Sequence, residues 1–133
     1  MNRPQCSSPI DEWLQVARKD LDRVRRNLRD GDAQAAGFFL QQSLEKYLKA
    51  FLLQRGWRLR KIHELHALLD DAIRHAASLE EFYSLCERVS GYYTGDRYPP
   101  LSLMDLTCED VQKDAEAAKP FILALFQGEA PYL

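Results

Sequence analysis

Apolar residues recur at spacings of three and four along almost the whole chain, and no segment of six or more residues alternates convincingly between apolar and polar. An α-helix turns once every 3.6 residues, so this spacing places the apolar side chains on one face of each helix, whereas a strand would need a period of two. The spacing therefore predicts an all-α fold, an antiparallel up-and-down bundle of four to five helices. A chain of 133 residues has the common size of a single domain, so we expect one domain over residues 1–133.

Glycine and proline divide the first half of the chain into two helices. Pro9 suits the first position of a helix, where its missing N–H costs nothing, and Gly31 suits the end of that helix. A turn this short makes the next helix antiparallel to the first. The second helix is expected from about 33 to 54, and its apolar residues cover more than one face, which predicts a central position in the bundle.

The second half is predicted to hold three shorter helices. We expect a third helix over about 63–77 and a fourth from Ser78, because Ser78 and Glu81 have the spacing of a capping box. The fourth helix is expected to fray toward 91–95. The segment 96–100 is then expected not to be helical, because Pro99 and Pro100 lack N–H donors and restrict the residue before them. A last helix is expected to run from Thr107 to Gly128.

Charge and targeting signals limit the class of protein. Lys and Arg number 18 against 20 Asp and Glu, for a net charge of −2 and an isoelectric point near 5.9. Generic coating of nucleic acid is therefore not expected, although a local basic patch is permitted. The first ten residues are too polar for a signal peptide, and no apolar run approaches the ~18 residues of a membrane span, so we expect a cytoplasmic protein without membrane contact.

Cysteine usage fits that location. The three cysteines, Cys6, Cys86 and Cys108, are an odd number without a CxxC spacing, which argues against a disulfide framework and a structural zinc site. Cys86 lies in a helical apolar pattern and is expected to pack as a small hydrophobic residue.

The first candidate site is a polar stripe on the otherwise apolar second helix, formed by Gln42, Glu45, Lys46 and Lys49 at i, i+3, i+4 and i+7. One interpretation is a solvated face on which Glu45 and Lys49 form an ordinary i,i+4 pair. The other is that polar groups on a central helix need partners, which a ligand, a loop or a second subunit could supply.

The second candidate site is the basic segment 55–66. His63 and His66 lie one helical turn apart, but a metal site needs a third ligand, and nearby carboxylates only partly share that face, so no metal is expected. His63 is expected to cap or pack at the start of the third helix. Four basic residues surround Trp57 and could meet phosphate, or could form an ordinary solvated loop.

The third candidate site is 92–99, which holds three tyrosines, an arginine and a proline. Aromatic faces and a guanidinium suit a base and a phosphate. Alternatively, Arg97 pairs with a carboxylate such as Glu45 while the tyrosines close the end of the bundle. The chain lacks the GxxxxGK[ST], GxGxxG, GxSxG and HExxH motifs of nucleotide-binding loops, serine hydrolases and zinc proteases.

In order along the chain, these segments resemble the HEPN family (higher eukaryotes and prokaryotes nucleotide-binding domain) over about 10–126. The matching motifs are Trp13-Leu14-x-x-Ala17-x-x-Asp20-Leu21, Phe39-x-Gln41-Gln42-x-x-Glu45-Lys46-x-x-Lys49-Ala50, His63-Glu64-Leu65 and Tyr93-x-x-x-Arg97-Tyr98-Pro99. The C-terminal domain of kanamycin nucleotidyltransferase has a related architecture.

The resemblance implies a non-catalytic, nucleotide-associated helical module without cofactor, usually dimeric, working with a minimal nucleotidyltransferase in a toxin–antitoxin-like or substrate-binding role. The residues expected to bind nucleotide are Gln42, Glu45, Lys49, His63, Tyr93, Arg97 and Tyr98.

Two other interpretations stay open. Many HEPN proteins are metal-independent ribonuclease toxins with an Arg-x(4–6)-His motif near the later helices. Here no histidine follows Arg97, and the spacing occurs instead between Arg58 and His63, before the segment where the motif is expected. In the ribonuclease interpretation, His63 is the general base and Arg58 stabilises the charge on the phosphorane. The third interpretation is a purely structural interaction module.

Overall fold

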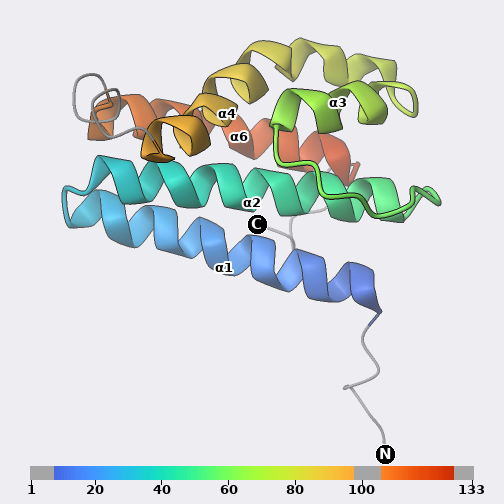
Figure 1. Ribbon diagram of the computed structural model, residues 1–133, viewed down its shortest axis with the longest axis horizontal. Coiled ribbons are helices and arrows are strands. Elements are labelled where there is room, and N and C mark those ends of the chain that lie inside the picture. Colours follow the sequence, from blue (N-terminus) through green and yellow to red (C-terminus); the bar gives the residue numbers. More distant parts are fainter. Residues whose placement is uncertain (1–7, 98–105, 128–133) are drawn as a thin grey trace, which may run out of the picture.

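A computed structural model describes residues 8–97 and 106–127, with the backbone alone for 93–97 (Figure 1). All regular elements in these ranges are helical, which confirms the predicted all-α bundle. They are α1 (Pro9–Arg29), α2 (Ala33–Leu53), α3 (Leu65–Ile73), the 3₁₀-helix η2 (Ala77–Phe82), α4 (Tyr83–Arg97) and α6 (Cys108–Leu125).

The first two helices form the antiparallel pair that the turn residues predicted. The Oγ of Ser8 accepts a hydrogen bond from the N–H of Asp11 and so caps α1, with Pro9 in its first turn. Gly31 has a φ of 77°, a left-handed conformation that closes α1 at little cost for glycine. Asp32 then caps α2 through the N–H of Ala35.

Helix α2 is the centre of the bundle. In Figure 1 it lies between α1 on one side and the layer of α3, α4 and α6 on the other, and packing contacts connect it to all four of these helices. Tyr47, Leu48 and Phe51 on α2 are fully buried, and Phe126 near the end of the described chain packs its ring against Tyr47. The predicted central position of this helix is therefore confirmed.

The later helices differ from prediction at their ends. Helix α3 begins at Leu65 rather than near residue 63, because the carbonyl of His63 accepts a side-chain hydrogen bond from Gln41 on α2. The predicted capping box at Ser78 is wrong: Ser78 is exposed and lies within η2, which begins without a side-chain cap. Burial of Leu79 holds this short turn in place.

Helix α4 continues to Arg97, so the expected fraying over 91–95 is wrong, and so is the expectation that residues 96 and 97 are not helical. Glycines at 91 and 95 weaken a helix by about 1 kcal/mol each relative to alanine. Packing outweighs this propensity, because Val89 is fully buried and Tyr92 packs against the core. The last helix begins after Thr107, as predicted, where Thr107 and Asp110 form a complete capping box; it continues through Pro120 and ends at Leu125, before the expected end at Gly128.

The N-terminus of α3 is capped from another helix. Its own N-cap residue, Glu64, makes no side-chain capping bond, and the N–H of Leu65 instead donates to the Oγ of Ser90 on α4 at 2.6 Å. We expect Ser90→Ala to lower the free energy of unfolding by about 1–2 kcal/mol, the cost of a lost cap. Urea unfolding measures this, with the exposed Ser84→Ala on the same helix as control; equal losses in the two variants would contradict a cap.

Across the part of the chain that the structure describes, no helix is long and apolar enough to cross a membrane.

Candidate functional site

Glu45 and Lys49 lie inside the protein, although both are charged. The two residues are 5% and 4% exposed, and Lys49 Nζ lies 2.7 Å from Glu45 Oε2. Their interpretation as a solvated pair is therefore wrong. Burying two charges requires that each keep partners, because every ion loses its hydration. The nearby Trp13 ring, 5.6 Å from the Lys49 ammonium, adds a cation–π contact.

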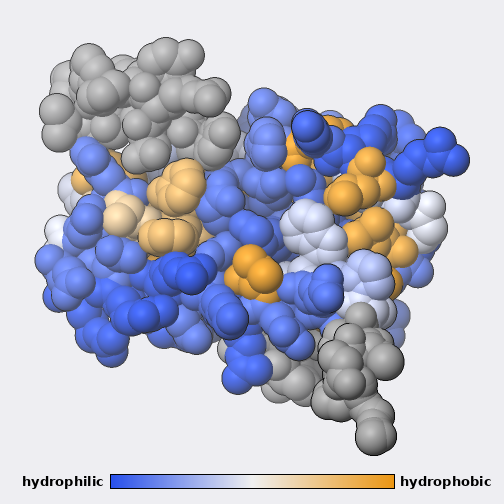
Figure 2. Space-filling model, turned by 60° about the horizontal axis from the view of Figure 1, so that its bottom comes forward, coloured by the Kyte–Doolittle hydropathy of each residue, from blue (hydrophilic) through white to orange (hydrophobic). Residues whose placement is uncertain are grey.

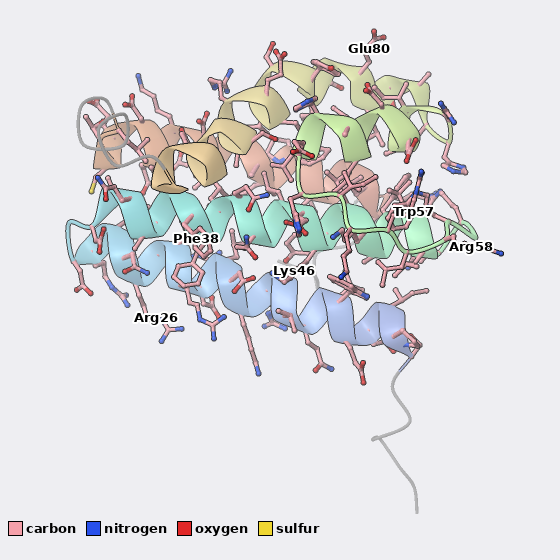
Figure 3. The ribbon with its side chains drawn as sticks, in the orientation of Figure 1. Arg26, Phe38, Lys46, Trp57, Arg58 and Glu80 are labelled. Carbon is pink, nitrogen blue, oxygen red and sulfur yellow. The ribbon has the colours of Figure 1, made fainter. Side chains whose placement is uncertain are left out.

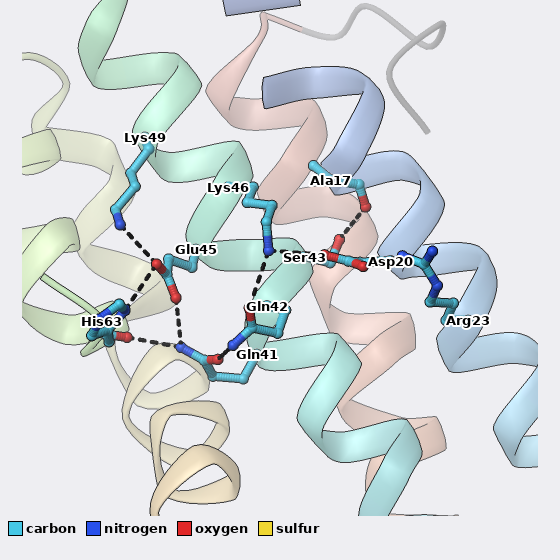
Figure 4. Close-up of polar contacts among 10 residues, drawn as sticks. All are labelled: Ala17, Asp20, Arg23, Gln41, Gln42, Ser43, Glu45, Lys46, Lys49 and His63. Carbon is cyan, nitrogen blue, oxygen red and sulfur yellow. Dashed lines mark hydrogen bonds and ion pairs between the residues drawn. The ribbon is translucent and has the colours of Figure 1, made fainter. Parts of the chain in front are cut away.

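Glu45 has two further partners, Gln41 one turn earlier on α2 and His63 in the segment before α3. Gln41 Nε2 donates to Glu45 Oε1 at 3.2 Å and to the His63 carbonyl at 2.8 Å, so the amide connects α2 to the segment before α3. His63 Nδ1 lies 3.2 Å from Glu45 Oε2, as Figure 4 shows. The His63 side chain is half exposed, whereas the Glu45 side chain is 7% exposed. The carboxylate thus orients an imidazole that solvent can reach.

A second carboxylate, Asp20 on α1, holds the other end of the stripe. Its oxygens accept from Arg23 Nη1 at 2.7 Å and from Lys46 Nζ at 3.0 Å, while the Asp20 side chain itself is 5% exposed. Lys46 also donates to Gln42 Oε1 at 3.1 Å. The Lys46 ammonium is therefore fixed between α1 and α2, in the position labelled in Figure 3.

One further bond joins the two halves. Gln42 Nε2 donates to Gln41 Oε1 at 2.9 Å, which links the Asp20–Lys46 group to the Glu45–Lys49–His63 group (Figure 4). We call the connected set the α2 polar network; its members are Asp20, Arg23, Gln41, Gln42, Glu45, Lys46, Lys49 and His63. The network is buried at Glu45 and Lys49 and reaches the surface at His63 and Arg23.

The structure brings four of the residues expected to bind nucleotide into this network: Gln42, Glu45 and Lys49 from the predicted stripe, and His63 from the second candidate site. Tyr93 and Arg97 belong to the last turns of α4, where only the backbone is described, and Tyr98 lies outside the described residues. A pair between Arg97 and Glu45 thus stays a prediction. The described partners of Glu45 are Gln41, Lys49 and His63.

Asp20 and Gln41 were not predicted as site residues, although both belong to the motifs that matched the HEPN pattern. The signal for Asp20 was its position beside Leu21 on the inward face of α1, where a carboxylate is rarely buried without a partner. Gln41 is fully buried and precedes the stripe by one residue.

Arg58 and His63, the alternative catalytic pair, point in different directions. Arg58 is exposed and projects away from the bundle in Figure 3, whereas the ring of His63 faces Glu45. The loop around Arg58 is anchored by Asp71, which accepts from the Trp57 indole at 3.1 Å and from Arg60 at 3.2 Å. The described residues contain no group of three or more side chains that could hold a metal ion.

Two aromatic rings contact the network, and two large apolar side chains are exposed elsewhere on the described surface. Figure 2 shows hydrophobic side chains in separate spots among hydrophilic ones on the face where α1 and α2 come forward. Val16 on α1 and Leu59 in the loop after α2 are the exposed large hydrophobic residues of the described chain, at 40% and 52%. Trp13 and Phe39 are partly buried, and their rings lie 5.6 Å from the Lys49 ammonium and 5.6 Å from the Arg23 guanidinium, respectively. The network thus opens onto a face that carries aromatic and apolar groups.

A separate polar cluster joins α4 to α6. Asp114 is 6% exposed and accepts from Arg88 at 2.9 Å and from the Tyr92 hydroxyl at 2.5 Å. Burial, together with the hydrogen bond to Asp114, raises the pKa of Tyr92 well above its usual value, so the phenol stays neutral. The ring of Tyr92 lies against Gly37 on α2, where an added Cβ would come within 3.3 Å of it. This cluster fastens α4 to its neighbours.

The fold and this network together define an α-helical domain with a polar centre on its longest buried helix. The HEPN domain model matches residues 10–125, so the chain belongs to the HEPN domain family. Among solved structures, the protein TT1696 from Thermus thermophilus superposes with a TM-score of 0.79, covering 92% of this chain and 100% of that one at 23% identity. At this identity the similarity concerns the fold. No curated protein matches the sequence.

Proposed function

We propose that the chain is a non-catalytic HEPN module that binds a nucleotide at the α2 polar network. The observation that carries the proposal is the network itself: a buried Glu45–Lys49 pair linked through two glutamines to Lys46 and His63, whose side chains are 18% and 50% exposed. A purely structural bundle needs no such set, because apolar side chains of similar volume stabilise a core equally well.

The chemistry of the exposed edge suits a nucleotide. The Lys46 ammonium and the His63 ring supply positive charge or hydrogen-bond donors for phosphate, and the Gln42 amide can donate and accept on the edge of a base. The Trp13 ring, partly buried on α1, adds an apolar face beside Lys49. Asp20 and Gln42 hold Lys46 in one position, which lowers the entropy lost on binding.

Nucleotide binding is tested by calorimetric titration with ATP, GTP and their monophosphates. We expect Lys46→Ala to weaken binding at least tenfold, since a charge-assisted hydrogen bond to phosphate contributes about 1.5–3 kcal/mol. Lys113→Ala on α6, an exposed lysine on another element, is the control and is expected to leave affinity unchanged. Equal affinity in the two variants would contradict nucleotide binding at the α2 polar network.

The non-catalytic part of the proposal has its own test. Incubation with RNA in the presence of EDTA is expected to leave the RNA intact, because Arg58 projects away while His63 faces Glu45. Cleavage that is lost in both Arg58→Ala and His63→Ala would establish the ribonuclease interpretation instead.

The proposal includes a homodimer and a minimal nucleotidyltransferase as partner, in a toxin–antitoxin-like or substrate-binding role. The support for an interface is the set of apolar and aromatic side chains at the surface, Val16, Trp13 and Phe39 among them, which a second chain would cover. Light scattering is expected to give about twice the chain mass of 15.4 kDa at micromolar concentration. A monomer that persists at high micromolar concentration would contradict the dimer.

A further inference from the structure

Positive charge is concentrated in the C-terminal half of α1. Residues 18–29 hold six cations and two carboxylates, a net charge of +4 within a chain whose total is −2. The rest of the chain is therefore acidic. No aromatic residue occurs in this segment, and five of the six cations are arginines.

Four of these cations have no internal role. Arg23 pairs with Asp20 and Arg25 with Asp22, but Arg18, Lys19, Arg26 and Arg29 form no ion pair with a described residue. All four are exposed, and Arg26 points away from the bundle in Figure 3. We call these four residues the α1 basic face.

The helix dipole accounts for only half of this face. Cations in the last turn of a helix are favourable, which covers Arg26 and Arg29. Arg18 and Lys19 lie in the middle of α1, where the dipole has no such effect. Their side chains are free to meet an external anion.

The composition of the α1 basic face favours double-stranded nucleic acid over an acidic protein or a single strand as its partner. A protein interface has an apolar centre from which charged residues are depleted, whereas a nucleic-acid interface is polar and strongly positive. On the described part of α1 the exposed large hydrophobic residue is Val16, which precedes the basic face. Single strands are bound largely by stacking on aromatic rings, which the segment lacks.

We propose that the α1 basic face binds the phosphate backbone of double-stranded nucleic acid without reading its sequence. From Arg18 to Arg29 the face extends about 16 Å at ~1.5 Å per residue, enough to meet several phosphates. Arginine forks bind phosphate oxygens in pairs. The acidic remainder of the chain turns this face toward the duplex and limits contact elsewhere. This site is separate from the α2 polar network and goes beyond the nucleotide binding proposed above.

The test is fluorescence anisotropy with labelled duplexes of RNA and DNA of about 20 base pairs and a single strand of about 20 nucleotides, at roughly 25 to 200 mM salt, the range over which phosphate contacts show their salt dependence. The variant is Arg18→Gln/Arg26→Gln/Arg29→Gln. The matched control, Arg74→Gln/Lys113→Gln/Lys119→Gln, removes the same charge from exposed positions at the end of α3 and on α6. Melting curves confirm that both variants fold, and ATP titration confirms that both keep the α2 site as it is in the parent protein.

We expect both duplexes to bind the parent protein with similar affinity. The α1 variant is expected to lose at least tenfold at about 25 mM salt, and its salt slope to fall by about 2–3, since each phosphate contact contributes ~0.9. The control is expected to stay within twofold.

Four results would overturn the proposal: no duplex binding at the lowest salt concentration, equal loss in variant and control, single strands bound more tightly than duplexes, or competition by poly-glutamate. Poly-glutamate that competes as well as duplex, charge for charge, would assign the face to an acidic protein instead.

Discussion

Glu45→Ala is expected to lower the free energy of unfolding by about 3–5 kcal/mol, the cost of removing one partner from a buried ion pair. In the variant the Lys49 side chain, which is 5% exposed in the parent protein, loses the carboxylate with which it pairs. It also removes the acceptor for Gln41 and the group that orients His63. Urea unfolding followed by circular dichroism measures the loss.

Three further variants show whether burial causes this effect. Asp22→Ala breaks an exposed pair with Arg25 that has similar geometry, and is expected to cost less than about 1 kcal/mol. Glu45→Gln removes the charge and one of the two acceptor oxygens but keeps the other oxygen as an acceptor, and should fall between the two. Glu45→Leu/Lys49→Met removes both charges and is expected to recover most of the stability. A loss in Glu45→Ala no greater than in Asp22→Ala would contradict the role of the pair.

The double variant also separates stability from function. If the α2 polar network serves only to fix the packing of α2 against α1 and α3, Glu45→Leu/Lys49→Met keeps every property of the parent. If the network binds nucleotide, this variant folds well and loses binding, because His63 no longer has its orienting carboxylate. A folded variant without affinity would therefore favour the proposed function over a purely structural one.

The sequence predicted the bundle because each of its signals was local. The caps at Ser8, Asp32 and Thr107 and the turn at Gly31 act within three or four residues, and all are found in the structure. Predictions failed where a distant contact decided the outcome. Ser90 caps α3 across 25 residues of sequence, and a local rule sees only Glu64 at that position.

In the candidate site, too, local spacing predicted one part, and contacts between distant segments decided the rest. The i, i+3, i+4, i+7 spacing on α2 identified the polar stripe, but could not choose between a solvated and a buried face. That choice depends on the segment before α3, which brings His63 over Glu45, and on α1, which brings Asp20 to Lys46. The two carboxylates belong to different helices, and no spacing within one helix reveals that they share a network.

Raising the pH is expected to destabilise the protein steeply above about pH 9. Burial raises the pKa of the Cys86 thiol from 9.0 to about 12, and burial likewise raises the pKa of Tyr47 from 10.0 to about 12. Because the pKa values are higher in the folded protein, the unfolded chain loses these protons at a lower pH than the folded protein does, and rising pH therefore favours unfolding. The stability that the neutral groups contribute is complete below about pH 9 and is lost as the pH rises toward about 12.

The size of this loss of stability follows from the linkage between protonation and folding. Each group lowers the free energy of unfolding by about 1.4 kcal/mol for every pH unit between its pKa in the unfolded chain and its pKa in the folded protein. By about pH 10.5 the Cys86 thiol alone lowers the free energy of unfolding by about 2 kcal/mol, with a smaller part from Tyr47. Urea unfolding at about pH 8 and about pH 10.5 measures the difference.

Cys86→Ala is less stable at the lower pH because it leaves a small cavity, yet it is expected to lose about 2 kcal/mol less than the parent protein on going to the higher pH. Cys108→Ala, at a partly exposed position near the start of α6, is the matched control and is expected to keep the parent's pH dependence. The same pH dependence in all three proteins would show that Cys86 does not titrate with unfolding.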